Sequence, residues 1–481
     1  MTAPTRTARA ARAAVLSLAL AQFIASYAAS NMNVAITTIA DDLDTDVAGI
    51  QTTITLFTLT MAALMIPGSK LTDIWGRRFC FLLGLAVYGA GALLAALAPG
   101  LGVLTVGYSL LEGVGSALLI PPIYILITVL FSDVKDRAKW FGVVSGAAGL
   151  GAAAGPLIGG LITATISWRA SFLLQVLFVA WVALLARRID DPPLPAERPA
   201  FDLLGAVLSA AGLFLVVFGI LQTNVHGWSS GRVWLLVGAG VAVLVGFFLY
   251  AAARERRGRA PLVSVRLFRN RTSNLGLITQ TVQWLVMQGA FFVISVFLQQ
   301  ERGYDAIQTG LMLVPATIGI LLSSGMAQRM ASRHPQRLLI RGGFTCTVGG
   351  LGLLLALARV DSAVWTFWPG LFLMGFGVGA MLTASVNVVQ SAWPEDEQGD
   401  ISGVSRSVSN LGSSLGVAIA GSVLVVATAG GNPPFLSAIV VVGTFALVGW
   451  LAALLLPKAP APAATVPGGA GGTAARGSGR R

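Results

Sequence analysis

The chain has 481 residues, of which 55% are hydrophobic and only 11% are charged, and its mean hydropathy is +0.79. This composition lies far outside the range of soluble domains and indicates a polytopic membrane protein. The net charge of +12 does not indicate nucleic-acid binding, because the basic residues lie between apolar runs. The two cysteines, Cys80 and Cys346, offer no disulfide framework and no metal spacing. The sequence also lacks a P-loop, so we expect no cofactor and no direct use of ATP.

Apolar runs of about 20 residues, the length that crosses a bilayer as a helix, recur along the chain. The first follows Arg6, Arg9 and Arg12 and continues to about residue 40, so we interpret it as an uncleaved first helix rather than a signal peptide. The sequence thus predicts an all-α protein with 14 transmembrane helices. These cover residues 14–40, 47–67, 79–98, 102–130, 140–164, 170–187, 203–222, 233–253, 273–299, 310–328, 338–357, 366–391, 403–428 and 434–456.

The distribution of basic residues predicts the orientation. With the N-terminus in the cytoplasm, only Arg169, Arg232, Arg302 and Arg359 of the 32 lysines and arginines lie outside. Cytoplasmic segments carry the excess of such residues in membrane proteins. We therefore expect both termini to be cytoplasmic.

Composition changes at three places divide the chain. Residues 188–202 carry charges and prolines, residues 254–271 are strongly basic, and residues 457–481 are rich in Ala, Pro and Gly. The basic segment is expected to contact anionic lipid headgroups, and the last segment is expected to be disordered. The predicted parts are an N-terminal six-helix bundle, linker segments with two additional transmembrane helices, a C-terminal six-helix bundle and a cytoplasmic tail, over residues 1–190, 191–271, 272–456 and 457–481.

The two predicted bundles carry the same glycine pattern. Gly151, Gly155, Gly159 and Gly160 recur at an offset of 261 as Gly412, Gly416, Ala420 and Gly421. Small residues four apart let membrane helices pack backbone to backbone. Internal repeats with a substrate site between them are typical of secondary transporters.

The charged segment between the second and third apolar runs, Gly68–Arg78, carries a recognisable spacing. Asp73, Gly76, Arg77 and Arg78 resemble the loop signature of the major facilitator superfamily, whose leading glycine falls at Ser69, beside Gly68. The resemblance implies a cytoplasmic gate in which the aspartate pairs with cations and helix ends. The alternative is an ordinary positively charged membrane loop.

The glycine segment of the fifth predicted helix adds a second resemblance. Gly151, Gly155, Pro156, Gly159 and Gly160 look like the signature that marks antiporters in this superfamily, which implies a hinge that controls the external gate. The alternative is a plain packing motif. Further segments are similar to the fourteen-helix drug:proton antiporter branch (multidrug efflux type), namely Trp168-Arg169, Leu298–Gly303 with Gly310 and Pro315, and Leu411–Ala418. The branch exports lipophilic, often cationic, drugs and antibiotics in exchange for protons.

Two departures from the branch concern its usual charges. The aspartate of helix 1 falls at Ala28, and in helix 4 the arginine falls at Ser109 and the following glutamine at Glu112. Glu112 is the only acid inside a predicted span, where a charge costs about 2.5–3.5 kcal/mol. Without a cation at its depth, burial favours the neutral acid, and we expect Glu112 to carry the coupled proton. The alternative is a protonated acid that only bonds a neighbouring helix.

Uncharged polar and aromatic residues on two helices are candidates for the substrate cavity. Tyr27 and Asn31 lie one turn apart, and Gln280, Trp284 and Gln288 share one helical face. Such groups suit a lipophilic substrate. The alternative is that they hold helices together.

These patterns predict a multi-pass protein of the cell membrane that is not an enzyme. The leading hypothesis is a secondary active transporter, expected to be monomeric, that exports lipophilic small molecules in exchange for protons by alternating access. The alternative, suggested by the missing charges at Ala28 and Ser109, is a facilitator or importer of a neutral metabolite without proton antiport. A membrane receptor without transport would leave the repeats and gate motifs without a role.

Overall fold

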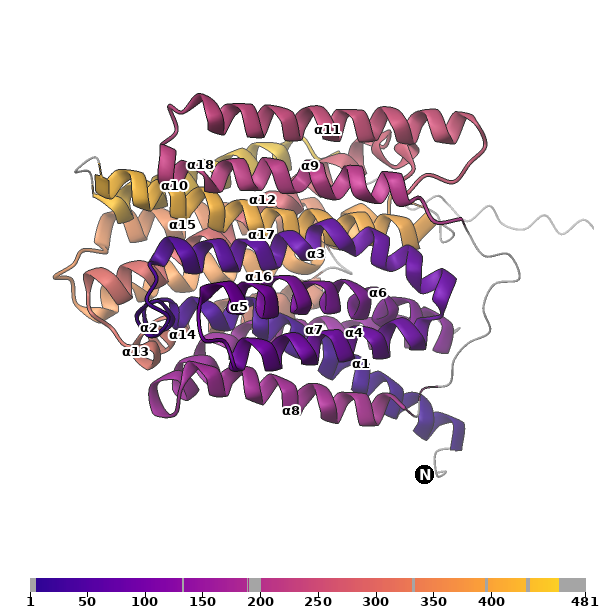
Figure 1. Ribbon diagram of the computed structural model, residues 1–481, viewed down its shortest axis with the longest axis horizontal. Coiled ribbons are helices and arrows are strands. Elements are labelled where there is room, and N and C mark those ends of the chain that lie inside the picture. The colour runs from indigo at the N-terminus through magenta and orange to yellow at the C-terminus, as the bar shows by residue number, and fades with distance from the viewer. Residues whose placement is uncertain are drawn as a thin grey trace, which may run out of the picture.

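The computed structural model describes residues 6–131, 134–187, 189, 200–330, 334–393, 397–429 and 433–457. Every element assigned within these ranges is a helix, and the helices run side by side (Figure 1). Fourteen of them are long and apolar enough to cross a membrane, which confirms the predicted number. Most of the predicted break at 188–202 and the predicted tail from residue 458 onward lie outside the described residues.

The helices form a first bundle, an inserted pair and a second bundle. The first bundle consists of α1 (Arg6–Asn31), η1 (Met32–Val34), α2 (Ile36–Asp42), α3 (Val47–Trp75), α4 (Arg77–Ala96), α5 (Leu101–Leu104), η2 (Thr105–Glu112), α6 (Gly113–Leu130), α7 (Val134–Thr165) and α8 (Trp168–Ala186). The inserted pair and its linker consist of α9 (Leu203–Leu221), α10 (Thr223–His226), α11 (Gly231–Arg256) and η3 (Val265–Phe268). The second bundle consists of α12 (Arg271–Val296), η4 (Phe297–Glu301), α13 (Ala306–Met312), α14 (Val314–Met330), α15 (Gln336–Leu357), η5 (Val364–Thr366), α16 (Trp368–Gln390), α17 (Gln398–Ala429) and α18 (Pro434–Leu454).

The helix starts follow from local sequence. Apolar segments satisfy their backbone groups internally as helices, and polar side chains cap the first turns. Asp46 accepts a bond from the Gly49 amide at the start of α3, and Asp305 forms a capping box with Gln308 at the start of α13.

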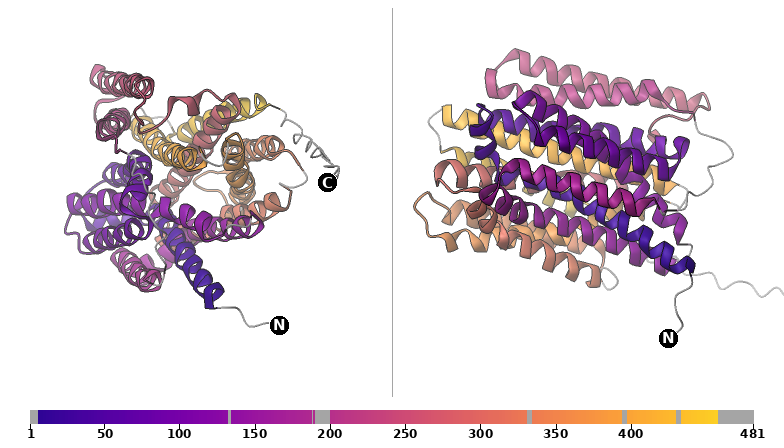
Figure 2. Two further views of the ribbon diagram at one scale, coloured as in Figure 1. Left: turned by 90° about the vertical axis from the view of Figure 1, so that its right-hand side faces the viewer. Right: turned by 60° about the horizontal axis from the view of Figure 1, so that its bottom comes forward.

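The two ends of the bundles are named as follows. We call the face where α1 begins and α18 ends the terminal face, and the face at the other end of the helices the opposite face. Figure 2 (left) looks onto the terminal face.

The repeated glycines serve the same close packing in both bundles. A Cβ atom at Gly151 of α7 would overlap the Phe23 carbonyl of α1, and one at Gly412 of α17 would overlap the Thr281 carbonyl of α12. Only glycine therefore lets these backbones approach so closely. The α1–α7 and α12–α17 pairs are equivalent contacts in the two bundles.

The inserted pair is not simply an outer appendage. Helix α9 packs along the seam between α3 and α17, where Val217 and Leu221 join Leu59 and Ala418 in a separate apolar cluster. Helix α11 packs on the outer side of α9 (Figure 1). The pair thus contacts both bundles through α9.

The segment Gly68–Arg78 differs from the expected loop. Helix α3 continues through Trp75, and the turn into α4 is confined to Gly76, whose φ of 104° favours glycine. The Thr72 hydroxyl donates to the Gly68 carbonyl, and a Cβ at Gly68 would overlap the Ala117 carbonyl of α6. The prediction of a loop was wrong because the charged residues extend the helix beyond the apolar run instead of ending it.

An ion pair ties the first bundle together at the opposite face. Arg169 donates to the Asp42 carboxylate, which also accepts a bond of 3.1 Å from the Trp168 indole. The hydrogen bond from Arg169 lowers the pKa of Asp42 below its ordinary value of 3.8.

This lowered pKa predicts an acid-dependent loss of stability. Because the folded state favours the carboxylate, Asp42 stabilises the fold above about pH 4, and the contribution disappears as the pH falls through the lowered pKa. Since the pair is partly exposed, we expect less than about 1 kcal/mol. Thermal unfolding in detergent at about pH 6 and about pH 3 should show a difference between wild type and Asp42→Asn that shrinks in acid. A difference that stays constant would contradict this role.

Candidate functional site

Glu112 ends η2, a π-helical turn inside the fourth membrane span. Such turns are rare and recur at functional sites. The Glu112 side chain is 0% exposed, and neither Oε1 nor Oε2 has a partner in hydrogen-bonding geometry. Helix α4 lies directly against the turn, since a Cβ at Gly91 would sit 2.7 Å from the Glu112 amide nitrogen. The acid is thus enclosed by protein at a local irregularity of its helix.

Tyr88 of α4 is the side chain that interacts with this carboxyl group. Its hydroxyl donates its single proton to Gln175 Oε1 of α8 at 2.6 Å. No lysine or arginine among the described residues acts on Glu112.

Ala28, which stands where the branch usually has an aspartate, lies beside this site. Ala28 is 0% exposed, and its carbonyl accepts a bond from Tyr108, which stands one turn before Glu112 on the same π-helical segment. The neighbouring Tyr27 shares a hydrogen bond of 2.6 Å with Ser171 of α8. Tyr27 therefore bonds within the first bundle.

The other proposed cavity residues have different surroundings. Asn31 is buried, and its Oδ1 has no hydrogen-bond partner. Gln288 donates to the Ala29 carbonyl across the two bundles at 3.4 Å, and Trp284 is half-buried. Gln280 accepts from Ser405 and donates to Ser409, which fixes α12 to α17 inside the second bundle. The structure thus brings Gln288 to α1 and places Gln280 in a helix–helix contact.

The glycine segment of α7 contacts both bundles. Within the first bundle, Cβ atoms at Gly155 and Gly159 would overlap the Ser30 and Asn31 side chains. Across the bundles, a Cβ at Gly160 would lie 2.5 Å from the Ala306 carbonyl, and one at Gly310 would overlap the Pro156 carbonyl. At Gly160 and Gly310 the obstructing atoms are backbone carbonyls, so only glycine fits there, whereas at Gly155 and Gly159 they are side-chain atoms.

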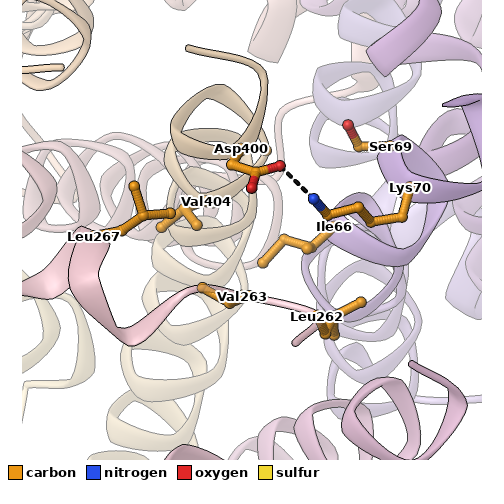
Figure 3. A pocket seen from close by; sticks show the side chains of 9 residues that line it. Ile66, Ser69, Lys70, Leu262, Val263, Leu267, Asp400 and Val404 are labelled. Atoms are coloured by element: carbon orange, nitrogen blue, oxygen red, sulfur yellow. Dashed lines mark hydrogen bonds and ion pairs between the residues drawn. The ribbon is translucent and has the colours of Figure 1, made fainter. Parts of the chain in front are cut away.

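At the terminal face the bundles are joined by an ion pair. Lys70 Nζ of α3 lies 2.5 Å from Asp400 Oδ1 of α17 (Figure 3). Asp73 is half-buried, and Lys70 and Arg77 are the cations that act on it. Arg78 donates to the Arg187 carbonyl within the first bundle. Lys70 of this segment thus reaches across to the second bundle, and sequence reasoning did not find its partner Asp400.

Charge reversal tests whether this ion pair holds the bundles together. We expect Lys70→Asp to raise cysteine-alkylation rates at the terminal-face ends of α3 and α17, and the double variant Lys70→Asp/Asp400→Lys to restore them. Because Asp400 is 43% exposed, the expected change is at most about fivefold. Equal rates in the single and double variants would show that the pair does not hold the ends together.

Sequence reasoning also missed a cation between the bundles. Arg406 of α17 lies over the Tyr124 ring of α6, 4.6 Å from its centroid, and donates to its hydroxyl. Tyr124 in turn donates to Gln22 of α1 at 3.4 Å. The signal was present in the sequence, since Arg406 lies inside the predicted span 403–428.

The fold and this site define a polytopic membrane transporter, with two equivalent bundles and a buried acid inside one span. The family model described as Major Facilitator Superfamily matches residues 18–417 and 277–478. The chain belongs to the Major Facilitator Superfamily, as the sequence motifs predicted.

Relatives of this chain have names that refer to transport, export or resistance. The chain is 31% identical over 401 residues to the probable actinorhodin transporter of Streptomyces coelicolor, and the match covers 81% of this chain and 68% of the relative. It is 31% identical to the puromycin resistance protein pur8 of Streptomyces alboniger, covering 83% and 78%. It is 30% identical to the cephamycin export protein CmcT of Amycolatopsis lactamdurans, covering 93% and 92%. These relatives confirm the predicted drug:proton antiporter branch.

A solved structure supports the fold. The human organic anion transporter MFSD10 (TETRAN) superposes with a TM-score of 0.61 at 15% sequence identity, covering 92% of this chain and 99% of that one. At this identity the likeness concerns the fold alone. Together, the family match and the 14 spans confirm the predicted fold class and the location as a multi-pass protein of the cell membrane. The chain is a transporter rather than an enzyme.

Proposed function

We propose that this chain exports lipophilic small molecules, antibiotics among them, in exchange for protons by alternating access, with the terminal face in the cytoplasm. The observation that carries the proposal is Glu112, a fully buried acid at a π-helical turn inside a span. Intramembrane ionisable groups mark proton and substrate pathways. The relatives named for export and resistance support the direction of transport.

The contacts between the bundles support alternating access. Residues 1–190 and 272–456 are proposed to move as units. At the opposite face they meet through Gly160 and Pro156, and at the terminal face through the Lys70–Asp400 pair. Backbone contacts of small residues and a partly exposed ion pair are weak enough to form and break in turn. In this scheme the glycine segment is the hinge and Gly68–Arg78 is the cytoplasmic gate.

Substrate is proposed to bind between the bundles, where α1 meets α12. Gln288 reaches α1 there, and Trp284 adds a half-buried aromatic surface. Asn31 of α1, whose oxygen has no hydrogen-bond partner among the described residues, lies against Gly159 of α7. A few polar groups among apolar and aromatic surfaces suit lipophilic compounds of varied structure.

The experiment is transport into proteoliposomes with an imposed pH gradient and a compound panel that includes puromycin and a cephamycin. We expect accumulation against the substrate gradient, accompanied by opposite proton movement that an internal pH-sensitive dye reports.

A second candidate function is a facilitator or importer of a neutral metabolite, which Ala28 and Ser109 favour. Ser109 donates to the Thr53 carbonyl where the branch has an arginine. Purely downhill flux that ignores the pH gradient would establish that candidate instead.

A further inference from the structure

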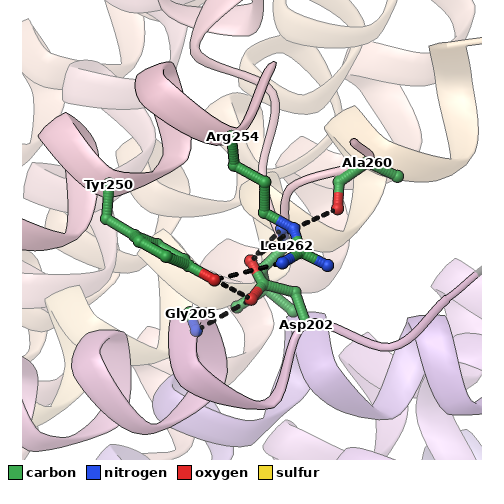
Figure 4. A network of polar contacts seen from close by, with 6 residues as sticks. All are labelled: Asp202, Gly205, Tyr250, Arg254, Ala260 and Leu262. Atoms are coloured by element: carbon green, nitrogen blue, oxygen red, sulfur yellow. Dashed lines mark hydrogen bonds and ion pairs between the residues drawn. The ribbon is translucent and has the colours of Figure 1, made fainter. Parts of the chain in front are cut away.

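The linker between α11 and α12 crosses the terminal face. We call residues 260–268 the strap; its last part is η3. The first anchor of the strap is Asp202, 3% exposed at the start of α9. Its carboxylate accepts bonds from the Leu262 amide at 3.0 Å, the Tyr250 hydroxyl at 3.0 Å and the Gly205 amide at 3.1 Å (Figure 4). One buried acid thus joins the strap to both helices of the inserted pair.

A second set of bonds runs from the end of α11 to the strap. Arg254 Nε donates to the Ala260 carbonyl at 2.8 Å. Glu255 accepts from the Ser264 hydroxyl at 2.8 Å and from the Val265 amide at 3.3 Å. The strap is therefore fixed to the inserted pair at both its beginning and its middle.

The other side of the strap covers the seam between the two bundles. Leu262, Val263 and Leu267 are 2–5% exposed. They line a small cavity whose other walls come from both bundles (Figure 3). The wall residues are Ile66, Ser69 and Lys70 of α3 and Asp400, Gly403 and Val404 of α17. The strap therefore lies directly over the Lys70–Asp400 pair.

The inserted pair also contacts the seam near the opposite face. Gln51 of α3 donates to the Val417 and Ala418 carbonyls of α17, and Asn224 of α10 donates to the Gln51 oxygen. Asn224 and α9 thus contact the seam away from the terminal face, whereas the strap contacts it at the terminal face.

We propose that the inserted pair and its strap form a clasp that stabilises the closed state of the terminal face. Opening this face separates α3 from α17, which would expose Leu262, Val263 and Leu267 to water. The strap would stay on the inserted pair, because Leu262 bonds to Asp202 while Ser264 and Val265 bond to Glu255. The clasp thereby biases the equilibrium between closed and open states. This inference rests on the proposed alternating access and gives the two additional helices a role in it.

The test uses a reporter cysteine under the strap. Ser69→Cys is introduced into the full chain in detergent, and its alkylation by a maleimide is followed by peptide mass spectrometry. Asp202→Ala removes the first anchor. Glu255→Ala removes a second anchor, the bonds to Ser264 and Val265, without touching a helix start. The matched control is Asp46→Ala, which removes the same kind of amide bond at the start of α3 but no contact to the strap.

We expect both anchor variants to alkylate about five- to tenfold faster than the parent, the range for one lost buried acceptor, and the control to remain at the parent rate. Unchanged rates in both anchor variants, each still unfolding cooperatively, would overturn the clasp. A rise in the control as well would assign the effect to general loosening and would also overturn it. The assay needs neither substrate nor pH gradient, so its failure and a failure of proton coupling are separate results.

Discussion

Replacing Glu112 with glutamine is expected to abolish substrate-driven proton movement and uphill export, to the level of protein-free liposomes. Glutamine keeps the size of the side chain but cannot exchange a proton. Among the described residues, Glu112 is the acid that is fully buried inside a span. The variant therefore removes the proposed proton carrier directly. The measurement is the internal-dye assay in proteoliposomes, run in parallel with substrate accumulation across a pH series.

The control is Glu301→Gln, an exposed acid at the opposite face, which should retain coupling. Downhill flux is expected to survive in Glu112→Gln, because the amide replaces a neutral acid in the same space. Retention of pH-dependent uphill export by Glu112→Gln would assign Glu112 a structural role and leave proton transport to another group.

Gly159→Ala is expected to destabilise the chain by about 1–3 kcal/mol, as overpacking does. The added methyl group would overlap the Asn31 side chain of α1, and both are inside tightly packed helices. The double variant Gly159→Ala/Asn31→Ala should regain most of the loss, because the nearest remaining atom, the Asn31 Cβ, lies 3.5 Å from the new methyl group. Thermal unfolding in detergent measures both effects.

Gly146→Ala on the same helix is the control, since a Cβ there meets no atom of the described residues within 4 Å. It should be neutral or slightly stabilising, as alanine favours helices over glycine. If Gly159→Ala were as stable as Gly146→Ala, the glycine segment would not be the tight contact described above. Rescue is scored by stability alone, because Asn31 is also a proposed substrate contact.

The membrane spans could be predicted from the sequence because a bilayer demands about 20 apolar residues for each helix. Helix ends were less predictable. The stretch Gly68–Trp75 is charged enough to be taken for a loop, yet its residues remain helical until the positive φ at Gly76. The expected first helix, 14–40, instead ends at Asn31 and continues as η1 and α2. Charge alone does not end a helix where it reaches water.

The candidate site could likewise be predicted from the sequence only in part. Glu112 could be found by counting acids inside spans, which requires no knowledge of contacts. The pairing of Lys70 with Asp400 joins residues 330 positions apart, and that of Tyr124 with Arg406 joins residues 282 apart. Such partners follow from how the bundles meet, which no local pattern encodes. The same holds for Gln280, whose face looked suited to a cavity but bonds to serines of α17.

The position of α9 also determines how compounds dissolved in the lipid could reach the interior. The two bundles meet along two lines, one where α3 lies against α17 and one where α7 lies against α13 and α14. In the described part of the chain, α9 covers the first line and packs on neither α7 nor α14. If the chain exports lipophilic molecules as proposed, those that partition into the membrane would therefore reach its interior along the line of α7 and α14 rather than along both.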